Sequence, residues 1–300
     1  MKSAKILFLI VCVMQSMSCQ KAGALTLESE IEVELPWIDT VSQDSTLRIA
    51  IIGDSISSFS GSAPSDMEGY EGVKYQHFYP RGDVKSIEGM WWYKVSAALG
   101  VTIDHISNCS WSGSRVTGNS SSMSNASAGC STKRIADLSF KSFNPDIILC
   151  YISCNDWAND VPVGNWSYLE GIPVEGIINT SREAYALMLH KIKECYPSSI
   201  VACITNLEDP KRDYTPGWPS NNSRGVTVDD WNKSIIELAE ALGCYVIDLR
   251  NCGIDYDNAP SYTLDGGLHP NDAGMTLIAK KVATELAIIL QKKRGCSLDG

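Results

Sequence analysis

The sequence of 300 residues predicts an α/β fold, a flavodoxin-like three-layer sandwich with a central parallel sheet of about five strands. Short apolar runs rich in β-branched residues alternate along the chain with longer segments whose apolar residues recur at helical spacing. This alternation favours parallel strands joined by right-handed crossovers. Ligands of such sheets bind at the carboxyl ends of the strands, so we expect the functional residues there.

The expected strands are short apolar runs, as is typical of strands that are buried on both faces. In order, they span residues 47–52, 101–106, 146–153, 199–205 and 245–249. The expected helices span residues 87–99, 133–140, 177–195, 228–242 and 271–291. The last helix is the most clearly marked, because Pro270 suits a first helical turn and apolar residues then recur at helical spacing.

A serine follows the first expected strand directly, in the run Gly53-Asp54-Ser55-Ile56-Ser57. Gly53 permits a sharp turn, and a helix after it would aim free N–H groups at Ser55. A lone serine at such a place more often caps the helix than reacts. The other segments of the chain therefore decide its role.

Polar residues also mark the ends of other strands. The second block is Asn108-Cys109-Ser110-Trp111-Ser112-Gly113, the third is Ser153-Cys154-Asn155-Asp156, and the last is Asp265-Gly266-Gly267-Leu268-His269-Pro270, just before the final helix. Together the blocks supply a hydroxyl nucleophile, an imidazole base and N–H donors for a developing oxyanion. Acyl transfer requires these groups.

In these four blocks and their order, the chain resembles the SGNH (GDSL-like) hydrolases. The resemblance implies a serine ester hydrolase in which Ser55 is the nucleophile. His269 would take the Ser55 proton and return it to the leaving alcohol. The backbone N–H groups of Ser55 and Gly113 and the side-chain amide of Asn155 would form the oxyanion hole.

Two blocks depart from the family pattern. Ser153 stands where the family has glycine, which we expect to be tolerated if the backbone there is not left-handed. Asp265 lies four residues before His269 rather than three, and the pair Gly266-Gly267 allows a bulge that absorbs the extra residue. We expect Asp265 to orient the imidazole. The alternatives are Asp272, or a Ser–His dyad aided by a backbone carbonyl.

Three further histidines carry weaker signals. His105 lies in an expected strand and His190 in a helical pattern, so both are expected to be structural. His77 lies in the first long loop, from which it could approach a substrate.

Aromatic side chains are frequent in the long segments that follow the strands, at residues 57–86, 111–132, 156–176 and 208–227. Aromatic faces stack on sugar rings, although about half of these side chains are expected to be core. Trp157, Arg81 and Arg115 are the candidate substrate contacts. The resemblance and the export signal described below imply removal of O-acetyl groups from carbohydrate. The alternatives are a lysophospholipase or thioesterase, and a non-catalytic carbohydrate-binding protein on the same fold.

The first 19 residues have the pattern of an export signal. Lys2 and Lys5 precede an apolar run that is too short to span a bilayer. Residues 15–19 resemble a bacterial lipobox, in which Cys19 would be lipidated; Ser16 departs from the usual leucine, so cleavage by a general signal peptidase is the alternative. We expect residues 20–45 to be a tether and 46–300 to be one hydrolase domain. The protein would be exported, periplasmic or at the cell surface, and attached to the membrane only through its N-terminus.

The composition argues against two classes of partner. A formal net charge of -10 disfavours nucleic acid, whose phosphates need a basic surface. No cysteine or histidine group has zinc-site spacing and no phosphate-cradling glycine loop follows the first strand, so we expect neither metal nor cofactor.

Eleven cysteines are many for a chain of this length. In an oxidising compartment, Cys109–Cys130 and Cys244–Cys252 are candidate disulfides. Cys150 and Cys203 fall within expected strands and are expected to be buried thiols.

Overall fold

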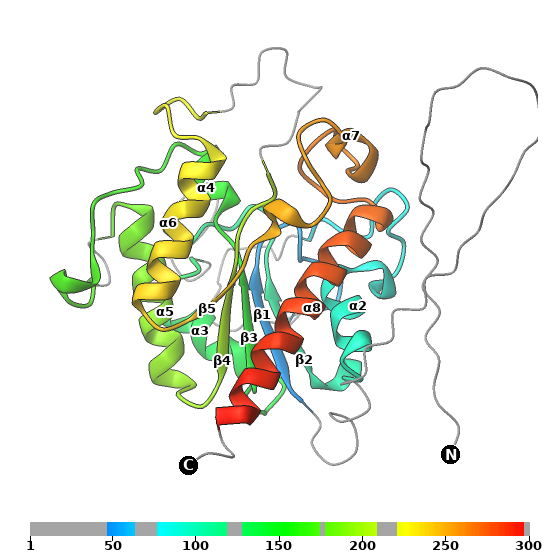
Figure 1. Ribbon diagram of the computed structural model, residues 1–300, viewed down its shortest axis with the longest axis horizontal. Coiled ribbons are helices and arrows are strands. Elements are labelled where there is room, and N and C mark those ends of the chain that lie inside the picture. Colours follow the sequence, from blue (N-terminus) through cyan, green and yellow to red (C-terminus); the bar gives the residue numbers. More distant parts are fainter. Residues whose placement is uncertain (1–46, 64–76, 119–127, 175–177, 209–220, 297–300) are drawn as a thin grey trace, which may run out of the picture.

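In the computed structural model, five parallel strands form one sheet with the order β2-β1-β3-β4-β5 (Figure 1). The strands are β1 Ile49–Gly53, β2 Ile106–Ser110, β3 Ile147–Tyr151, β4 Ile200–Ile204 and β5 Tyr245–Ile247. This order is that of the flavodoxin-like sheet, so the predicted fold class is confirmed.

The structure describes residues 47–63, 77–118, 128–174, 178–208 and 221–296, with side chains through residue 293. The expected export signal, Cys19 and the tether lie outside these residues. Within the described part, no helix is both long and apolar enough to cross a bilayer.

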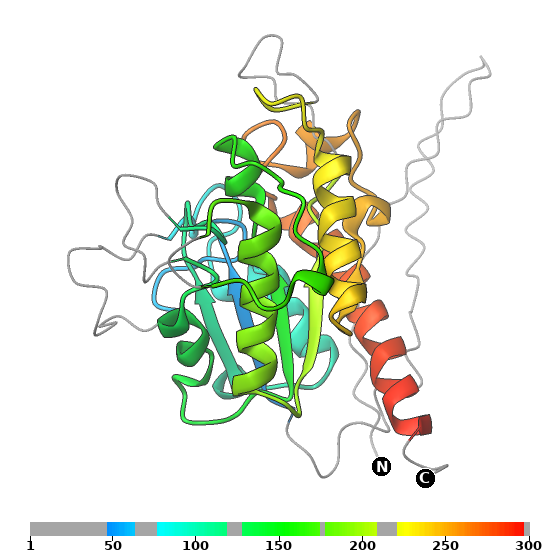
Figure 2. The same ribbon diagram turned by 90° about the vertical axis from the view of Figure 1, so that its left-hand side faces the viewer.

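Helices cover both faces of the sheet (Figure 2). The α-helices are α2 Trp91–Ala98, α3 Thr132–Ala136, α4 Cys154–Ala158, α5 Ser181–Cys195, α6 Val228–Ala241, α7 Ala259–Tyr262 and α8 Asp272–Cys296. Short 3-10 turns span Ile87–Gly89, Ile103–His105, Asp137–Ser139, Tyr168–Glu170 and Leu249–Asn251. Helices α2 and α8 pack on one face of the sheet, and α3, α5 and α6 pack on the other.

Side chains of β1, β3 and β4 alternate between two hydrophobic cores. In β1, Ile49 and Ile51 join the core under α2 and α8, whereas Ala50 and Ile52 join the core under α3, α5 and α6. Successive side chains of a strand point to opposite faces, so a strand covered on both sides is typically apolar throughout. This requirement explains the unbroken apolar runs in the sequence.

Capping residues set where two of the helices begin. Thr180 accepts a hydrogen bond from the Glu183 backbone N–H, and the Glu183 side chain accepts one from the Thr180 backbone. Thr227 and Asp230 form the same reciprocal pair at the start of α6. Such pairs satisfy N–H groups that have no partner inside the helix. They explain why α5 begins at Ser181, later than predicted.

The second strand was predicted in the wrong place. Residues 103–105 form a 3-10 turn, and the strand occupies Ile106–Ser110 instead. Asn108 is fully buried in β2, where its Nδ2 donates to the Ser57 carbonyl and its Oδ1 accepts from the Ser110 N–H. These partners remove the cost of burying its amide, which hydrophobicity alone does not predict.

Both candidate disulfides are wrong, because none of the four cysteines forms a disulfide in the structure. The Cys109 thiol instead donates to the Asp137 carbonyl at 2.9 Å. Cys252 belongs to the core under α2 and α8, whereas Cys244 packs against the opposite core, so the sheet separates the two.

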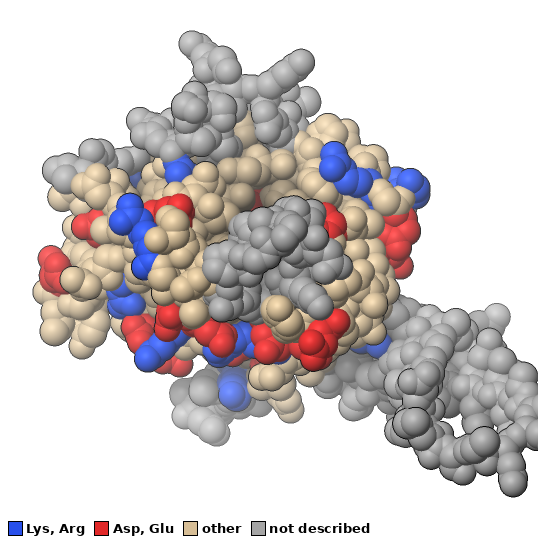
Figure 3. Space-filling view, turned by 90° about the horizontal axis from the view of Figure 1, so that it is seen from above, with Lys and Arg blue, Asp and Glu red and all other residues tan. Residues whose placement is uncertain are grey.

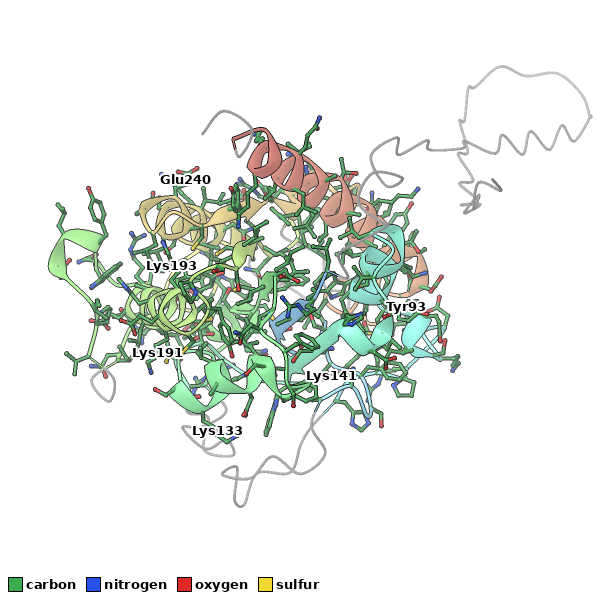
Figure 4. All side chains as sticks on the ribbon, turned by 90° about the horizontal axis from the view of Figure 1, so that it is seen from below. Tyr93, Lys133, Lys141, Lys191, Lys193 and Glu240 are labelled. Carbon is green, nitrogen blue, oxygen red and sulfur yellow. The ribbon has the colours of Figure 1, made fainter. Side chains whose placement is uncertain are left out.

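Lysines join the helices at the amino ends of the strands (Figure 4). Lys193 of α5 donates to the Leu242 carbonyl at the end of α6, and Lys191 donates to the Cys130 carbonyl just before α3. These contacts link α5 to the end of α6 and to the segment just before α3.

Candidate active site

The four polar blocks meet at the carboxyl ends of β1, β2 and β3. This end of the sheet is uppermost in Figure 1, and Figure 3 looks down onto it. Most of the Lys, Arg, Asp and Glu side chains visible in that view lie toward its margin.

His269 connects Ser55 to Asp265. Its Nε2 lies 2.9 Å from Ser55 Oγ, and its Nδ1 lies 2.5 Å from Asp265 Oδ2. Ser55 is 5% exposed and His269 is 9% exposed, so bulk water has little access to this chain of hydrogen bonds. The arrangement has the geometry of a nucleophile, a base and an orienting carboxylate.

A tight loop gives Asp265 its position. Gly266 has a φ of 75°, a left-handed conformation that glycine adopts without strain. Asp265 Oδ1 accepts the backbone N–H groups of Leu268 at 3.0 Å and His269 at 2.9 Å, which leaves Oδ2 for the imidazole. Asp272 instead pairs with Lys94 Nζ at 3.1 Å, so this alternative orienter is excluded.

The pKa of Asp265 reflects these contacts. Burial alone would raise the pKa, but hydrogen bonds from the ring and backbone of His269, together with the Leu268 N–H, outweigh it. The resulting pKa is about 2, below the ordinary value of 3.8. The carboxylate therefore stays ionised beside His269 across the neutral range.

Ser55 lies in a turn, not at the start of a helix. The Ser57 N–H donates to the Asp54 carbonyl and the Ser58 N–H donates to the Ser55 carbonyl, and no helix follows β1 directly. The prediction of a helix directly after Gly53 is therefore wrong, and Ser55 is not a helix cap. A Cβ on Gly53 would lie 2.6 Å from Ser110 Oγ and 2.8 Å from Ser57 Cβ, so only glycine fits before this turn.

Hydrogen bonds bring the predicted oxyanion donors together. The Gly53 carbonyl accepts the Trp111 N–H at 3.1 Å and the Ser114 hydroxyl at 3.2 Å, and these bonds hold the Gly113 loop against β1. The Ser114 carbonyl in turn accepts one Asn155 Nδ2–H at 3.0 Å.

These donors remain available for a ligand. In the described part of the chain, neither the Ser55 nor the Gly113 backbone N–H has an acceptor. Asn155 keeps the second hydrogen of its amide, since a primary amide has two. Gly113 has a φ of 76°, and a Cβ there would meet nothing within 4 Å, so space is open above it.

Two acidic side chains connect the blocks, and sequence analysis gave neither a role. Asp156 is fully buried and accepts from Val116 N at 2.7 Å and from Thr117 N at 3.0 Å and Oγ1 at 2.7 Å. Asp54 accepts from the Ile56 N–H at 3.1 Å and from Cys154 Sγ at 3.0 Å. Burial raises the pKa of both carboxyl groups.

A buried arginine also lies beneath the site. Arg134 is fully buried, and its guanidinium donates to the Gly53 carbonyl and, at 2.9 Å, to the Cys109 carbonyl. It thus joins the carboxyl ends of β1 and β2. Nothing in the local sequence distinguishes it from a helix arginine that faces solvent.

We expected serine to be tolerated at position 153 only if the backbone there is not left-handed, and the structure does not meet this condition. The φ of Ser153 is 134° and its ψ is -10°, in the region that favours glycine. The strain is partly offset because the buried Ser153 hydroxyl accepts the Trp231 Nε1–H at 3.2 Å. The substitution is therefore retained at a local cost in backbone energy.

An apolar pocket opens beside Ser55. Its lining includes Ile56, Cys154 and Leu268. These residues are next in sequence to the predicted site residues Ser55, Asn155 and His269, respectively. Trp157 and Leu207 form part of its wall, and its cavity volume is about 30 Å³.

The candidate substrate contacts have different environments. Trp157 lies in the pocket wall but is 3% exposed and donates its Nε1–H to the Val226 carbonyl, so it presents no open stacking face. Arg115 is half-buried and donates to the Gly118 carbonyl. Arg81 is exposed, and its Cζ lies 4.3 Å from the centre of the Phe78 ring. Among the described residues, no group of three His, Cys, Asp or Glu side chains could hold a metal ion.

Comparison with known proteins identifies related folds. The family model of GDSL-like lipase/acylhydrolase matches residues 47–216. A GDSL-like lipase from Bacteroides uniformis has a TM-score of 0.57 and 22% identity over 81% of this chain and 97% of its own. A family two carbohydrate esterase from Clostridium thermocellum, in complex with cellohexaose, has a TM-score of 0.50 and 16% identity over 82% of this chain and 65% of its own. A search of curated proteins found no match.

Proposed function

This chain belongs to the GDSL-like lipase/acylhydrolase family and hydrolyses ester bonds, and on that premise we propose that it removes O-acetyl groups from carbohydrate through an acyl-enzyme on Ser55. The observation that carries the mechanism is the hydrogen-bonded chain from Ser55 through His269 to Asp265.

Acylation begins when His269 Nε2 takes the Ser55 proton and Oγ attacks the ester carbonyl carbon. The charge that develops on the carbonyl oxygen is met by the N–H groups of Ser55 and Gly113 and by the Asn155 amide. The bond from carbon to the sugar oxygen then breaks, and the imidazolium returns its proton to that oxygen. Asp265 stabilises the imidazolium while it exists.

Deacylation repeats these steps with water. His269 takes a proton from water while the water oxygen attacks the acyl carbon. The tetrahedral intermediate then collapses as the bond between the acyl carbon and Ser55 Oγ breaks. The imidazolium then protonates Ser55 Oγ. Acetic acid leaves, and the free enzyme is regenerated.

The pocket supports a short acyl group. A cavity of about 30 Å³ holds roughly two or three water-sized groups, since each needs about 10–15 Å³ by the same measure. An acetyl group fits within that volume. The buried side chains of Trp157 and Leu207 bound part of this cavity, which favours a short acyl group over a long one.

Support for a carbohydrate alcohol comes from the carbohydrate esterase that shares the fold. We further propose that the expected leader exports the protein, and that a lipid on Cys19 attaches it to the membrane. Metabolic labelling with a palmitate analogue tests the attachment: the wild type is labelled and Cys19→Ala is not. Labelling of both proteins, or of neither, contradicts it.

Acyl-chain preference tests the proposed substrate. We expect p-nitrophenyl acetate to be hydrolysed with a higher kcat/KM than the octanoate or palmitate, and acetate to be released from acetylated glycans. A preference for the long chains would identify a lipid esterase instead. Binding of an acetylated oligosaccharide without turnover of any ester would identify a binding protein.

A further inference from the structure

An aromatic ring covers one face of the His269 imidazole. The Phe78 ring lies parallel to it, with 3.6 Å between the ring centres and 8° between the planes. At this separation the two rings are in van der Waals contact and no water fits between them. The role of Phe78 was not apparent from the sequence, because Phe78 and His269 lie far apart in the chain.

Phe78 is itself held in place from both sides of the site. Its backbone N–H donates to Ser58 Oγ at 2.9 Å, three residues after the nucleophile. The hydroxyl of its neighbour Tyr79 donates to the Pro270 carbonyl at 2.6 Å, directly after the histidine. The ring position is therefore fixed relative to both Ser55 and His269.

The Arg81 guanidinium lies over the same ring, 4.3 Å from its centre. Because the imidazole already covers one face of Phe78, the guanidinium lies on the other face. Planar guanidinium groups stack on aromatic faces, and this contact restrains the ring from the solvent side.

We propose that Phe78 is a positioning residue that holds the His269 imidazole in its reactive orientation, with Arg81 restraining the outer face of the phenyl ring. The inference rests on the proposed acyl-enzyme mechanism. Hydrogen bonds at Nδ1 and Nε2 hold the edges of the imidazole but do not by themselves prevent it from tilting. A parallel ring in contact with its face does.

The restraint matters most after Ser55 has been acylated. The Ser55 oxygen then has no proton to share with Nε2, so the hydrogen bond that fixed this edge of the imidazole in the free enzyme is lost. Asp265 and Phe78 are left to keep the ring aimed at the incoming water. Phe78 is therefore expected to affect deacylation more than acylation.

Steady-state and burst kinetics with p-nitrophenyl acetate test the proposal on the full chain. Phe78→Leu removes the flat face, and we expect kcat to fall about 10- to 100-fold. KM should fall with kcat, because a slower deacylation step lowers both. The deacylation rate should fall more than the burst rate. Phe78→Tyr keeps the ring and should retain activity near that of the wild type.

Phe143→Leu is the matched control. The Phe143 ring lies 6.4 Å from the His105 ring, so this change removes an aromatic neighbour from a histidine outside the site. Thermal unfolding checks that each variant is folded, and Phe78→Met replaces Phe78→Leu if the latter does not fold. If the wild type hydrolyses the ester, the proposal is overturned by a Phe78→Leu variant with the same kcat as the wild type. It is also overturned if Phe143→Leu loses as much activity as Phe78→Leu, or if the kcat of Phe78→Tyr is as low as that of Phe78→Leu. A wild type without turnover would overturn the proposed function instead.

Discussion

The Nδ1 atom of His269 lies 2.5 Å from Oδ2 of Asp265, which stands four positions earlier in the sequence. The left-handed Gly266 and the two backbone N–H groups that Asp265 accepts shape a loop in which this spacing suits a carboxylate–imidazole pair. The contact makes Asp265, and neither Asp272 nor a backbone carbonyl, the partner of the imidazole.

Removal of this carboxylate should slow ester hydrolysis without unfolding the protein. Asp265→Asn cannot stabilise the imidazolium, and the kcat for p-nitrophenyl acetate should fall by about two to four orders of magnitude. Asp272→Asn is the control, because its carboxylate pairs with Lys94 away from the imidazole. Equal activity of the two variants would exclude Asp265 from the mechanism.

The low pKa of Asp265 also predicts how stability depends on pH. A carboxylate whose pKa falls from 3.8 to about 2 on folding stabilises the native state above pH 4. That contribution is lost as the pH falls through about 2. The difference in Tm between the wild type and Asp265→Asn, measured from pH 6 to pH 2, should therefore shrink on acidification. A difference that stays constant or grows would be inconsistent with this pKa.

Glycine should suit position 153 better than alanine does. Both Ser153→Gly and Ser153→Ala lose the hydrogen bond from Trp231, but only glycine relieves the strain at a φ of 134°. The strain costs about 1–3 kcal/mol, and the extra freedom of glycine in the unfolded chain offsets about 0.4–1 kcal/mol of the gain. In urea unfolding, Ser153→Gly should be the more stable variant by about 1–2 kcal/mol. Equal stabilities would show that the backbone there is not strained.

Asn155 should contribute to kcat rather than to substrate binding. Asn155→Ala removes one oxyanion donor, which typically costs about 10²- to 10³-fold in kcat. Asn258→Ala is the control, since its amide donates to the Gly253 carbonyl in an exposed loop. Loss of activity through KM alone, with kcat unchanged, would place Asn155 outside the oxyanion hole.

The sequence predicted most of the strands and helices because their signals are local. Apolar runs, helical spacing and the position of Pro270 depend on neighbouring residues, and they predicted four of the five strands at overlapping positions. The second strand was misplaced because it buries polar side chains, among them Asn108, whose amide donates to the Ser57 carbonyl. The two candidate disulfides were incorrect for the same reason, because the distance between two cysteines depends on tertiary structure and not on the local sequence.

The blocks of the site were predictable, but the groups that hold them together were not. Ser55, His269 and Asp265 occur in short motifs that follow strands or precede a helix. Asp156 and Arg134 act on backbone groups far away in the chain, so their partners appear only after folding. Phe78 was one of many aromatic residues in the long loops, and the sequence did not indicate which of them pack in the core and which lie at the site.

Covalent labelling of Ser55 by a fluorophosphonate is the most direct test of the central claim, that the hydroxyl of residue 55 is activated by His269. Peptide mapping by mass spectrometry should find the adduct on Ser55 in the wild type, with labelling abolished in Ser55→Ala and strongly slowed in His269→Ala. An adduct on another residue, or equal labelling of the His269→Ala variant, would contradict it.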